Sequence, residues 1–231
     1  MRIQKYLSQQ GILSRREAER YLLKGWIKVN GQVVTALGTQ IDPDRDEVTL
    51  TTALVQEKAS KSYWALYKPR GIVTTVPQAG EKAIKDILPA RFSQLYPVGR
   101  LDKDSEGLIL LTDDGVFAKT CLQSQEPHER VYEVWVDRPM TDGMCEKIES
   151  GLMLFGERCK PCKVVLRRER VLTMTLWEGK NRQIRRMIQK VGARVTRLKR
   201  IRFGTVGLGT LRPGEVRRLS SDQVATFGAD T

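Results

Sequence analysis

The hydrophobic pattern of the first 50 residues predicts a compact module of two helices and a β-hairpin. Two groups of apolar residues recur at the helical spacing of three and four positions: Ile3, Tyr6 and Leu7, then Ala18, Tyr21 and Leu22. Ser14 and Glu17 have the spacing of a capping box, so we expect the second helix to begin after Ser14. Strand-like residues then flank Asn30 and Gly31, a pair that is favoured in two-residue hairpin turns.

From residue 63 onward the pattern changes to a mixture of strands and helices. Residues 51–62 lack periodicity, and we expect them to be a linker. Apolar runs predict strands at 63–67, 72–76, 108–111, 131–136, 163–166 and 172–176, and amphipathic spacing predicts helices near 84–88, 115–122, 141–151 and 184–191. Because these elements follow no regular βαβ repeat, the expected class is α+β, with domains at 1–60 and 61–231.

The net charge of the chain is +13, and its distribution adds to this picture. Residues 167–202 contain 13 Lys or Arg and two Asp or Glu, whereas the other segments are close to neutral. A positive segment of this density indicates a polyanionic partner such as nucleic acid. The alternative is a basic surface that contacts only solvent.

Other features exclude several classes of protein. No apolar run is long enough to span a membrane, and the first residues lack the apolar region of a signal peptide. The four cysteines show no disulfide-like framework. Cys159 and Cys162 form a C-x-x-C pair without a second pair at zinc-finger spacing, so we expect two incidental cysteines. We therefore expect a cytoplasmic protein that does not contact a membrane.

One short segment carries the strongest candidate for chemistry. Residues 99–108 read Gly-Arg-Leu-Asp-Lys-Asp-Ser-Glu-Gly-Leu and precede a buried apolar run. A carboxylate such as Asp102 can act as a nucleophile if it stays ionised, and a nearby cation such as Arg100 favours the ionised form. The alternatives are a structural Arg–Asp pair and a hydrolase that uses Asp102 and Asp104 as paired acids.

Two further segments could complete a site. Tyr132 lies inside an apolar strand, where it could stack on a ligand or simply be part of the core. Arg182, Arg185 and Arg186 lie just before and in the first half of the helix at 184–191, where the helix dipole disfavours cations unless anions are near. An ordinary basic amphipathic helix is the alternative.

These motifs together resemble one group of ribosomal RNA pseudouridine synthases. The group comprises type A, which acts on the small ribosomal subunit, and types B, E and F, which act on the large one; the likeness is greatest to type F. Residues 11–34 resemble the RNA-binding module named after ribosomal protein S4. The resemblance implies an S4-like module followed by a larger domain with a mixed, largely antiparallel sheet flanked by helices. It implies the conversion of a specific uridine, most simply in large-subunit 23S rRNA, to pseudouridine.

The resemblance also assigns roles to residues. Asp102 would be the nucleophile, Tyr132 would pack against the target base, and Arg185 would pair with Asp102. The residues expected to contact RNA are Arg15, Arg16, Arg20, Lys24, Arg100, Lys180, Asn181, Arg182 and Arg186. An isomerisation adds no group and transfers no electrons, so neither a cofactor nor a metal is expected.

Several alternatives remain open at this point. The substrate could be 16S rRNA or tRNA, and it could be free RNA or part of a ribosomal assembly intermediate. A non-catalytic RNA-binding or ribosome-assembly protein would explain the charge and the first module equally well. It would not explain why Arg100, Asp102, Tyr132 and Arg185 all occur in matching motifs. We expect a monomer.

Overall fold

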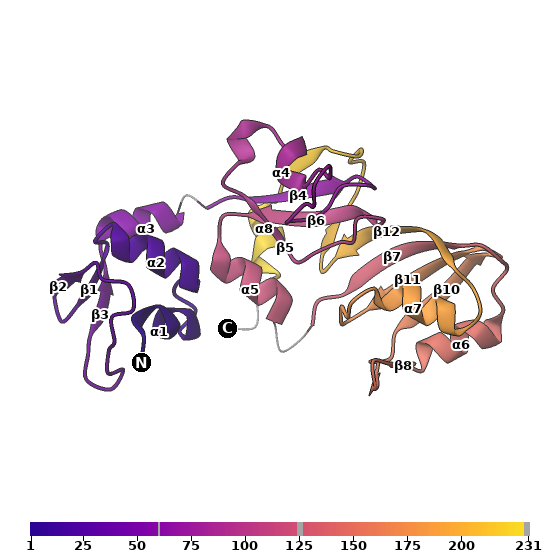
Figure 1. Cartoon of the computed structure of the whole chain (residues 1–231), viewed down its shortest axis with the longest axis horizontal. Helices are drawn as coiled ribbons and strands as arrows, with labels where there is room; N and C mark the ends of the chain where they lie inside the picture. Colours follow the sequence, from indigo (N-terminus) through magenta and orange to yellow (C-terminus); the bar gives the residue numbers. More distant parts are fainter. Residues whose placement is uncertain (60, 124–126, 229–231) are drawn as a thin grey trace.

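The computed structural model describes residues 1–59, 61–123 and 127–228 (Figure 1). The first part is a small α/β module with a three-stranded sheet in the order β2-β1-β3. Its elements are α1 (Ile3–Gln9), α2 (Arg15–Leu23), β1 (Ile27–Val29), β2 (Gln32–Val34), β3 (Val48–Leu50) and α3 (Thr52–Ala59).

The capping box and the hairpin turn are both present in this module. The Ser14 amide donates to Glu17 Oε2 at 3.0 Å, and the Glu17 amide donates to Ser14 Oγ at 3.3 Å. Asn30 and Gly31 have positive φ angles of 51° and 78°, as a two-residue hairpin turn requires. The predicted linker is wrong for residues 52–59, which form α3 and bury Leu54 in the core of the module.

A long, twisted sheet forms the larger part of the molecule. The strands follow the order β10 (Lys163–Arg168), β11 (Val171–Leu176), β7 (Arg130–Val136), β12 (Val195–Phe203), β6 (Glu106–Thr112), β4 (Tyr63–Lys68) and β14 (Val216–Arg218). β13 (Val206–Gly207) pairs with β12, and β5 (Tyr96–Val98) pairs with β6. Every one of these pairings is antiparallel except β6 with β12.

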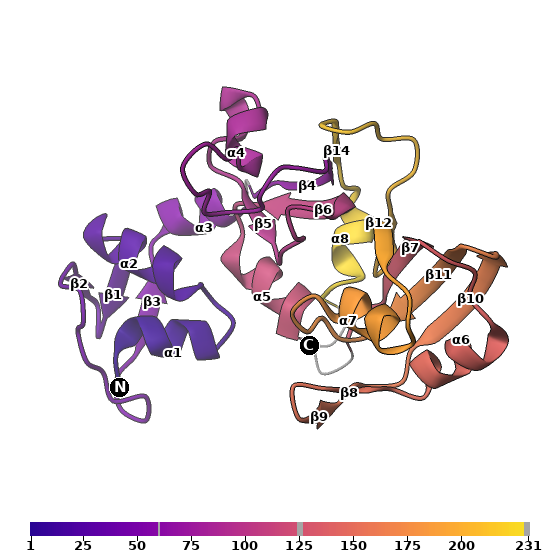
Figure 2. The same cartoon turned by 45° about the vertical axis from the view of Figure 1, so that its right-hand side comes forward.

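Short helices lie along this sheet (Figure 2). They are α4 (Ile84–Ile87), the 3-10 turn η1 (Ala90–Phe92), α5 (Gly115–Gln123), α6 (Asp142–Glu149), α7 (Gln183–Lys190) and α8 (Ser221–Ala225). β8 (Met153–Leu154) and β9 (Glu157–Arg158) form a separate hairpin below α7. The expected α+β class, with a mixed and mostly antiparallel sheet, is confirmed. The predicted strand at 72–76 is wrong, because Val73 makes only an isolated bridge to Ala83.

The sheet has a hydrophobic core at each end, and a third, smaller cluster on β4 and β6 includes Leu66, Ile109 and Leu111. On the β10–β11–β7 side, α6 and α7 cover a core that includes the fully buried Met174 and Met187. On the other side, α5 and α8 cover a core that includes Phe117, Phe203 and Phe227. The central strands β7, β12 and β6 connect the two cores and carry the residues described below.

The parallel crossing of β6 and β12 requires a glycine. Gly107 lies opposite Arg200, and its φ of 102° is in the region that L side chains avoid. A Cβ atom at this position would lie 2.3 Å from the Arg200 carbonyl oxygen. The absence of a side chain therefore lets the strand that follows Asp102 pair with the strand that follows α7.

Candidate active site

A cleft of about 370 Å³ lies where the β5–β6 loop, the face of β7 and β12, and the segment before α7 meet. Asp102, Tyr132 and Arg182 all line this cleft, together with Arg100, Lys180 and Asn181. Three segments that are far apart in the sequence thus come together, as the motif-based hypothesis requires. Arg185 and Arg186 do not line it.

Asp102 lies in the loop between β5 and β6, with its side chain one-third exposed. Its ion partner among the described residues is Arg182, with 3.6 Å between Arg182 Nη1 and Asp102 Oδ2. Arg182 occupies the N-cap position of α7 with a φ of 50°, a left-handed conformation that is unfavourable for arginine. This conformation occurs at the point where the guanidinium reaches the carboxylate.

The backbone around Asp102 is held from several sides. On the N-terminal side, Thr74 Oγ1 accepts from the amide of Leu101 and donates to its carbonyl. On the C-terminal side, the carbonyls of three successive residues accept hydrogen bonds. Lys103 O accepts from the Gly71 amide, Asp104 O from Arg185 Nη2, and Ser105 O from Lys68 Nζ. The residues on each side of the Asp102 carboxylate are therefore fixed through their main chain. A nucleophile gains from such positioning, because catalysis depends on a preorganised geometry.

Lys68 is the buried cation beneath this loop. Its side chain is fully buried, and Nζ donates to the carbonyls of Pro69, Ile72 and Ser105 at 2.9, 2.6 and 2.8 Å. Burial lowers the pKa of Lys68 to about 8, partly offset by the charge of Asp102. The sequence analysis missed Lys68, although a lysine that ends an apolar strand directly before Pro69 was a visible signal.

The expected ion pair between Arg185 and Asp102 is not formed among the described residues, where Arg182 pairs with Asp102 instead. Its guanidinium donates to Asp104 O at 3.1 Å, Ser105 Oγ at 3.4 Å and Val195 O at 3.4 Å. Burial, followed by the nearby Arg182, lowers the pKa of Arg185. In this geometry Arg185 fixes the loop that carries Asp102, and Arg182 faces the carboxylate. Arg100 is exposed at the rim and makes no ion pair among the residues that the structure describes.

Tyr132 is part of the floor of the cleft, which is rich in arginine. Tyr132 is half-buried on β7 and lies directly opposite Arg200 of β12. The guanidiniums of Arg130 and Arg200 lie 5.1 and 5.4 Å from the centre of the Phe203 ring. Burial lowers the pKa of Arg130.

Arg200 is almost completely buried, at 4% exposure. Its Nε donates to Leu108 O at 2.7 Å, and its Nη2 has no partner in the described part of the chain. Neither Arg130 nor Arg200 pairs with a carboxylate of a described residue, so the floor of the cleft carries uncompensated positive charge. The sequence analysis missed both residues. Arg130 could have been found, because it lies two positions before Tyr132 on the same face of a strand.

The other predicted RNA contacts near α7 divide into two groups. Lys180 lines the cleft, but its Nζ is paired with Glu157 at 2.9 Å. Asn181 is exposed at the cleft. Arg186 lies outside the cleft, with its guanidinium 4.3 Å from the centre of the Phe155 ring in the β8–β9 hairpin. Its expected contact with the RNA backbone would therefore be away from the reaction centre.

The four basic residues expected to bind RNA on α2 also divide into two pairs. Arg20 and Lys24 both pair with Glu57 of α3, at 3.3 and 3.2 Å. Arg15 and Arg16 are exposed and line a second cavity, of about 640 Å³, between α2 and the β5–β6 part of the sheet. Arg15 and Arg16 are thus the two cations of this group that have no carboxylate partner among the described residues.

The residues that could support other chemistries are placed unfavourably for them. Cys159 and Cys162 are buried in the core, and burial raises the pKa of both thiols, that of Cys162 to about 12. The described residues contain no group of three or more His, Cys, Asp or Glu side chains that could hold a metal ion. Within residues 1–59, 61–123 and 127–228, no helix has the length and apolar character needed to cross a membrane.

A continuous mixed sheet, an acidic side chain in a cationic cleft and a small α/β module with exposed arginines suit an enzyme that acts on RNA. The sequence profile of the RNA pseudouridylate synthase family matches residues 62–190, and that of the S4 domain matches residues 1–47. The chain belongs to the RNA pseudouridylate synthase family, and it acts as an isomerase that converts uridine in RNA to pseudouridine.

Individual relatives agree with this assignment. The dual-specificity RNA pseudouridine synthase RluF of Escherichia coli O6:H1 is 38% identical over 97% of this chain and 77% of its own length. Ribosomal large subunit pseudouridine synthase B of Bacillus subtilis is 34% identical over 99% of this chain and 96% of its own. A crystal structure of a pseudouridylate synthase superposes with a TM-score of 0.73 at 27% identity, covering 98% of this chain and 99% of that one.

Proposed function

We propose that this enzyme isomerises a specific uridine of large-subunit ribosomal RNA, with Asp102 as the nucleophile. The Bacillus subtilis relative is named for the ribosomal large subunit, which supports the choice of RNA. The observation that carries the assignment of the site is the convergence of Asp102, Arg182 and Tyr132 on one cleft. The RluF relative is named as dual-specificity, so a second RNA substrate belongs among the RNAs to be tested.

The proposed chemistry begins with breakage of the glycosidic bond. An oxygen of Asp102 attacks C1′ of the flipped-out nucleotide, and the electron pair of the C1′–N1 bond passes to the uracil. Tyr132 holds the detached base by stacking while the base turns to present C5 to C1′. The C5–C1′ bond forms as the bond to Asp102 breaks. C5 then loses its proton to Tyr132 or to water acting as the base, and N1 takes up a proton from solvent. Atoms and electrons balance without a cofactor.

The arginines on the floor of the cleft suit the charge that appears during this reaction. The uracil carries negative charge once its bond to C1′ has broken. Arg130 is next to Tyr132 on the same face of the sheet and lacks a carboxylate partner within the described structure. Preorganised donors at a developing charge lower the barrier to reaction. Arg130, supported by Arg200, would therefore stabilise the detached base.

The rest of the molecule would hold the RNA. Among the predicted RNA contacts, the exposed residues without an ion-pair partner in the described structure are Arg15, Arg16, Arg100 and Asn181, and these are the first candidates for contacts to the RNA backbone. Arg182 is paired with Asp102. We take residues 1–60 as the RNA-binding domain and residues 61–231 as the catalytic domain. The enzyme would work as a cytoplasmic monomer, on free rRNA or on an assembling ribosomal particle.

The test is release of tritium from rRNA transcripts labelled at uracil C5. We expect wild type to release tritium and Asp102→Ala to lose essentially all turnover. Arg130→Gln should lower the single-turnover rate about 10²-fold, as for loss of one oxyanion donor, with little change in RNA binding. Arg138→Gln is the matched control, because Arg138 is exposed just after β7 and outside the cleft.

Two outcomes would contradict these roles. Near-full turnover by Asp102→Ala would show that another group starts the reaction. RNA binding by wild type without any tritium release would favour a non-catalytic RNA-binding protein. Mapping pseudouridines in 23S rRNA, 16S rRNA and tRNA, from cells with and without the gene, identifies the modified uridine.

A further inference from the structure

The turn of the β8–β9 hairpin contains a residue that its backbone disfavours. Phe155 and Gly156 form a two-residue turn with φ angles of 55° and 80°. The β1–β2 hairpin has almost the same turn, with φ angles of 51° and 78°, but there the first residue is Asn30. Asparagine tolerates the left-handed region, whereas a bulky aromatic residue adopts it at a cost.

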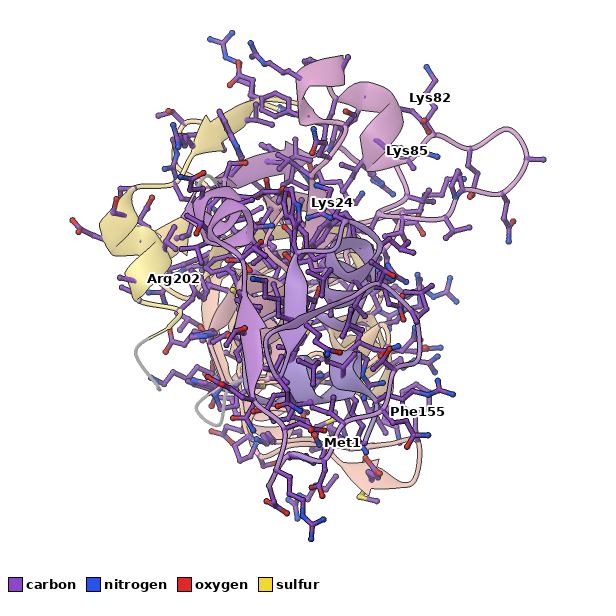
Figure 3. All side chains as sticks on the ribbon, turned by 90° about the vertical axis from the view of Figure 1, so that its left-hand side faces the viewer. Met1, Lys24, Lys82, Lys85, Phe155 and Arg202 are labelled. Carbon is purple, nitrogen blue, oxygen red and sulfur yellow. The ribbon has the colours of Figure 1, made fainter. Side chains whose placement is uncertain are left out.

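Burial does not account for the choice of phenylalanine. The Phe155 side chain is 60% exposed, and the neighbouring Met153 is 51% exposed. Figure 3 shows Phe155 at the right-hand side of the molecule, below its centre, and Figures 1 and 2 show its hairpin extending beyond α7. Neither the local conformation nor the core therefore favours an aromatic residue here, and such outliers are enriched at functional positions.

The surroundings of Phe155 are basic and connect to the reaction cleft. The Arg186 guanidinium lies over the Phe155 ring at 4.3 Å, and Lys190 lines the same shallow cavity of about 460 Å³. The ion pair between Glu157 of the hairpin and Lys180 joins this surface to the segment that lines the cleft. An aromatic ring with adjacent cations is the combination that binds unpaired nucleotides, by stacking on the base and by attraction to the phosphate.

We propose that Phe155 is a stacking platform for an unpaired base of the RNA substrate, outside the cleft that receives the target uridine. Arg186 supports one side of the ring and leaves the exposed part for the base. The charge of the 167–202 segment favours RNA over a protein partner at this surface. The proposal rests on RNA as the substrate of this family, and not on which uridine is modified.

The β1–β2 turn supplies the substitution for the test. Phe155→Asn gives the second hairpin the same turn residues as the first, so we expect an unchanged or higher thermal midpoint of unfolding. The probe is a fluorescently labelled, unmodified large-subunit rRNA transcript at fixed salt. Its dissociation constant should rise at least about fivefold, since stacking of one base contributes about 1 kcal/mol or more. A variant that is stable yet binds weakly cannot be explained by loss of fold.

Two more variants separate stacking from general apolar contact. Phe155→Trp should bind as well as wild type or better, and Phe155→Leu should bind as weakly as Phe155→Asn. Val165→Thr is the control, because it also removes an exposed apolar side chain, from the edge strand β10, and should leave binding unchanged. The proposal is overturned if Phe155→Asn binds RNA within twofold of wild type, or if Phe155→Leu binds as tightly as wild type.

Activity provides an independent readout. If wild type releases no tritium from any transcript, the proposed function fails, but the binding measurements on the Phe155 variants still decide the stacking proposal. If wild type is active and the Phe155 variants bind normally, only the stacking proposal fails.

Discussion

Arg182 has an unfavourable backbone conformation and also forms the ion pair with Asp102, the proposed nucleophile. A non-glycine residue in the left-handed region costs on the order of 1 kcal/mol. The side chain makes no cap hydrogen bond to α7 that would offset this cost. Its guanidinium instead lies 3.6 Å from Asp102, so the conformation serves the site at the expense of the helix.

This leads to opposite expectations for stability and activity in Arg182→Gly. Glycine removes the strain, while loss of a half-exposed ion pair costs about 0–1 kcal/mol. Thermal unfolding should therefore show a midpoint equal to or above that of wild type, and tritium release should fall at least about tenfold. Arg182→Lys retains the charge and the strain and is the control. A glycine variant with full activity would remove Arg182 from the site.

Lys68 predicts a dependence of stability on alkaline pH. Its pKa is about 8 when folded, against an ordinary value of 10.5, because burial disfavours the charged form. Between these two pH values the unfolded chain binds more protons, so the free energy of unfolding attributable to Lys68 rises with pH. Wild type should gain on the order of 1–3 kcal/mol relative to Lys68→Met between pH 8 and 10, measured by urea unfolding. If the free energy of unfolding changes with pH by the same amount in the two proteins, the lowered pKa of Lys68 is contradicted.

At the scale of elements, the sequence correctly predicted the helices and turns that depend on interactions between residues close in sequence. The Ser14 capping box, the hairpin at Asn30 and the helix at 184–191 depend on residues close in sequence, and all three are present. The prediction missed α3, whose apolar face is weak, and the pairing of β12 with β6, which depends on contacts between distant residues. The cleft residues Asp102 and Tyr132 could be predicted because each lies in a short motif of residues that are close in sequence. Lys68 and Arg130 also had local signals that the prediction did not use, whereas the contribution of Arg200 needed the tertiary structure.

The β6–β12 crossing makes a specific prediction for glycine substitutions. Gly107→Ala places a Cβ 2.3 Å from backbone that cannot move away without separating the strands. We expect a loss of at least about 3 kcal/mol in the free energy of unfolding, together with loss of activity. Gly80→Ala is the matched control. Gly80 also has a positive φ, of 79°, but open space around its Cβ position, so the loss should be about 1 kcal/mol. Equal losses would show that the crossing tolerates a side chain.

At the scale of the whole molecule, a buried ion pair fixes the N-terminal module against the sheet. Lys61 Nζ lies 2.9 Å from Glu17 Oε1 and donates to Asp113 O at 2.8 Å, and both charged side chains are less than 10% exposed. The two parts are in close contact here, because a Cβ on Gly115 would lie 2.4 Å from Ser14 Oγ. The placement of the helix α2 beside α5 and the end of β6 depends on this contact.

Removing one partner of the Lys61–Glu17 ion pair should lower the free energy of unfolding more than removing both charges. Lys61→Met leaves Glu17 buried and unpaired, so we expect a loss of about 3–5 kcal/mol in urea unfolding. The double variant with Glu17→Gln should recover most of this loss, since glutamine can still complete the capping box. A double-mutant cycle measures the coupling between the two sites. A loss below about 0.5 kcal/mol for Lys61→Met would contradict a structural role for the pair.

The order of strands also sets when the enzyme can become active during its own synthesis. The N-terminal module is complete once residue 59 has emerged, and it can fold from local contacts. The cleft cannot form at that stage, because its floor includes β12, which ends at Phe203 and pairs with β6 through Lys199 and Glu106. A nascent chain would therefore carry a folded RNA-binding module for most of its translation before it could modify any RNA.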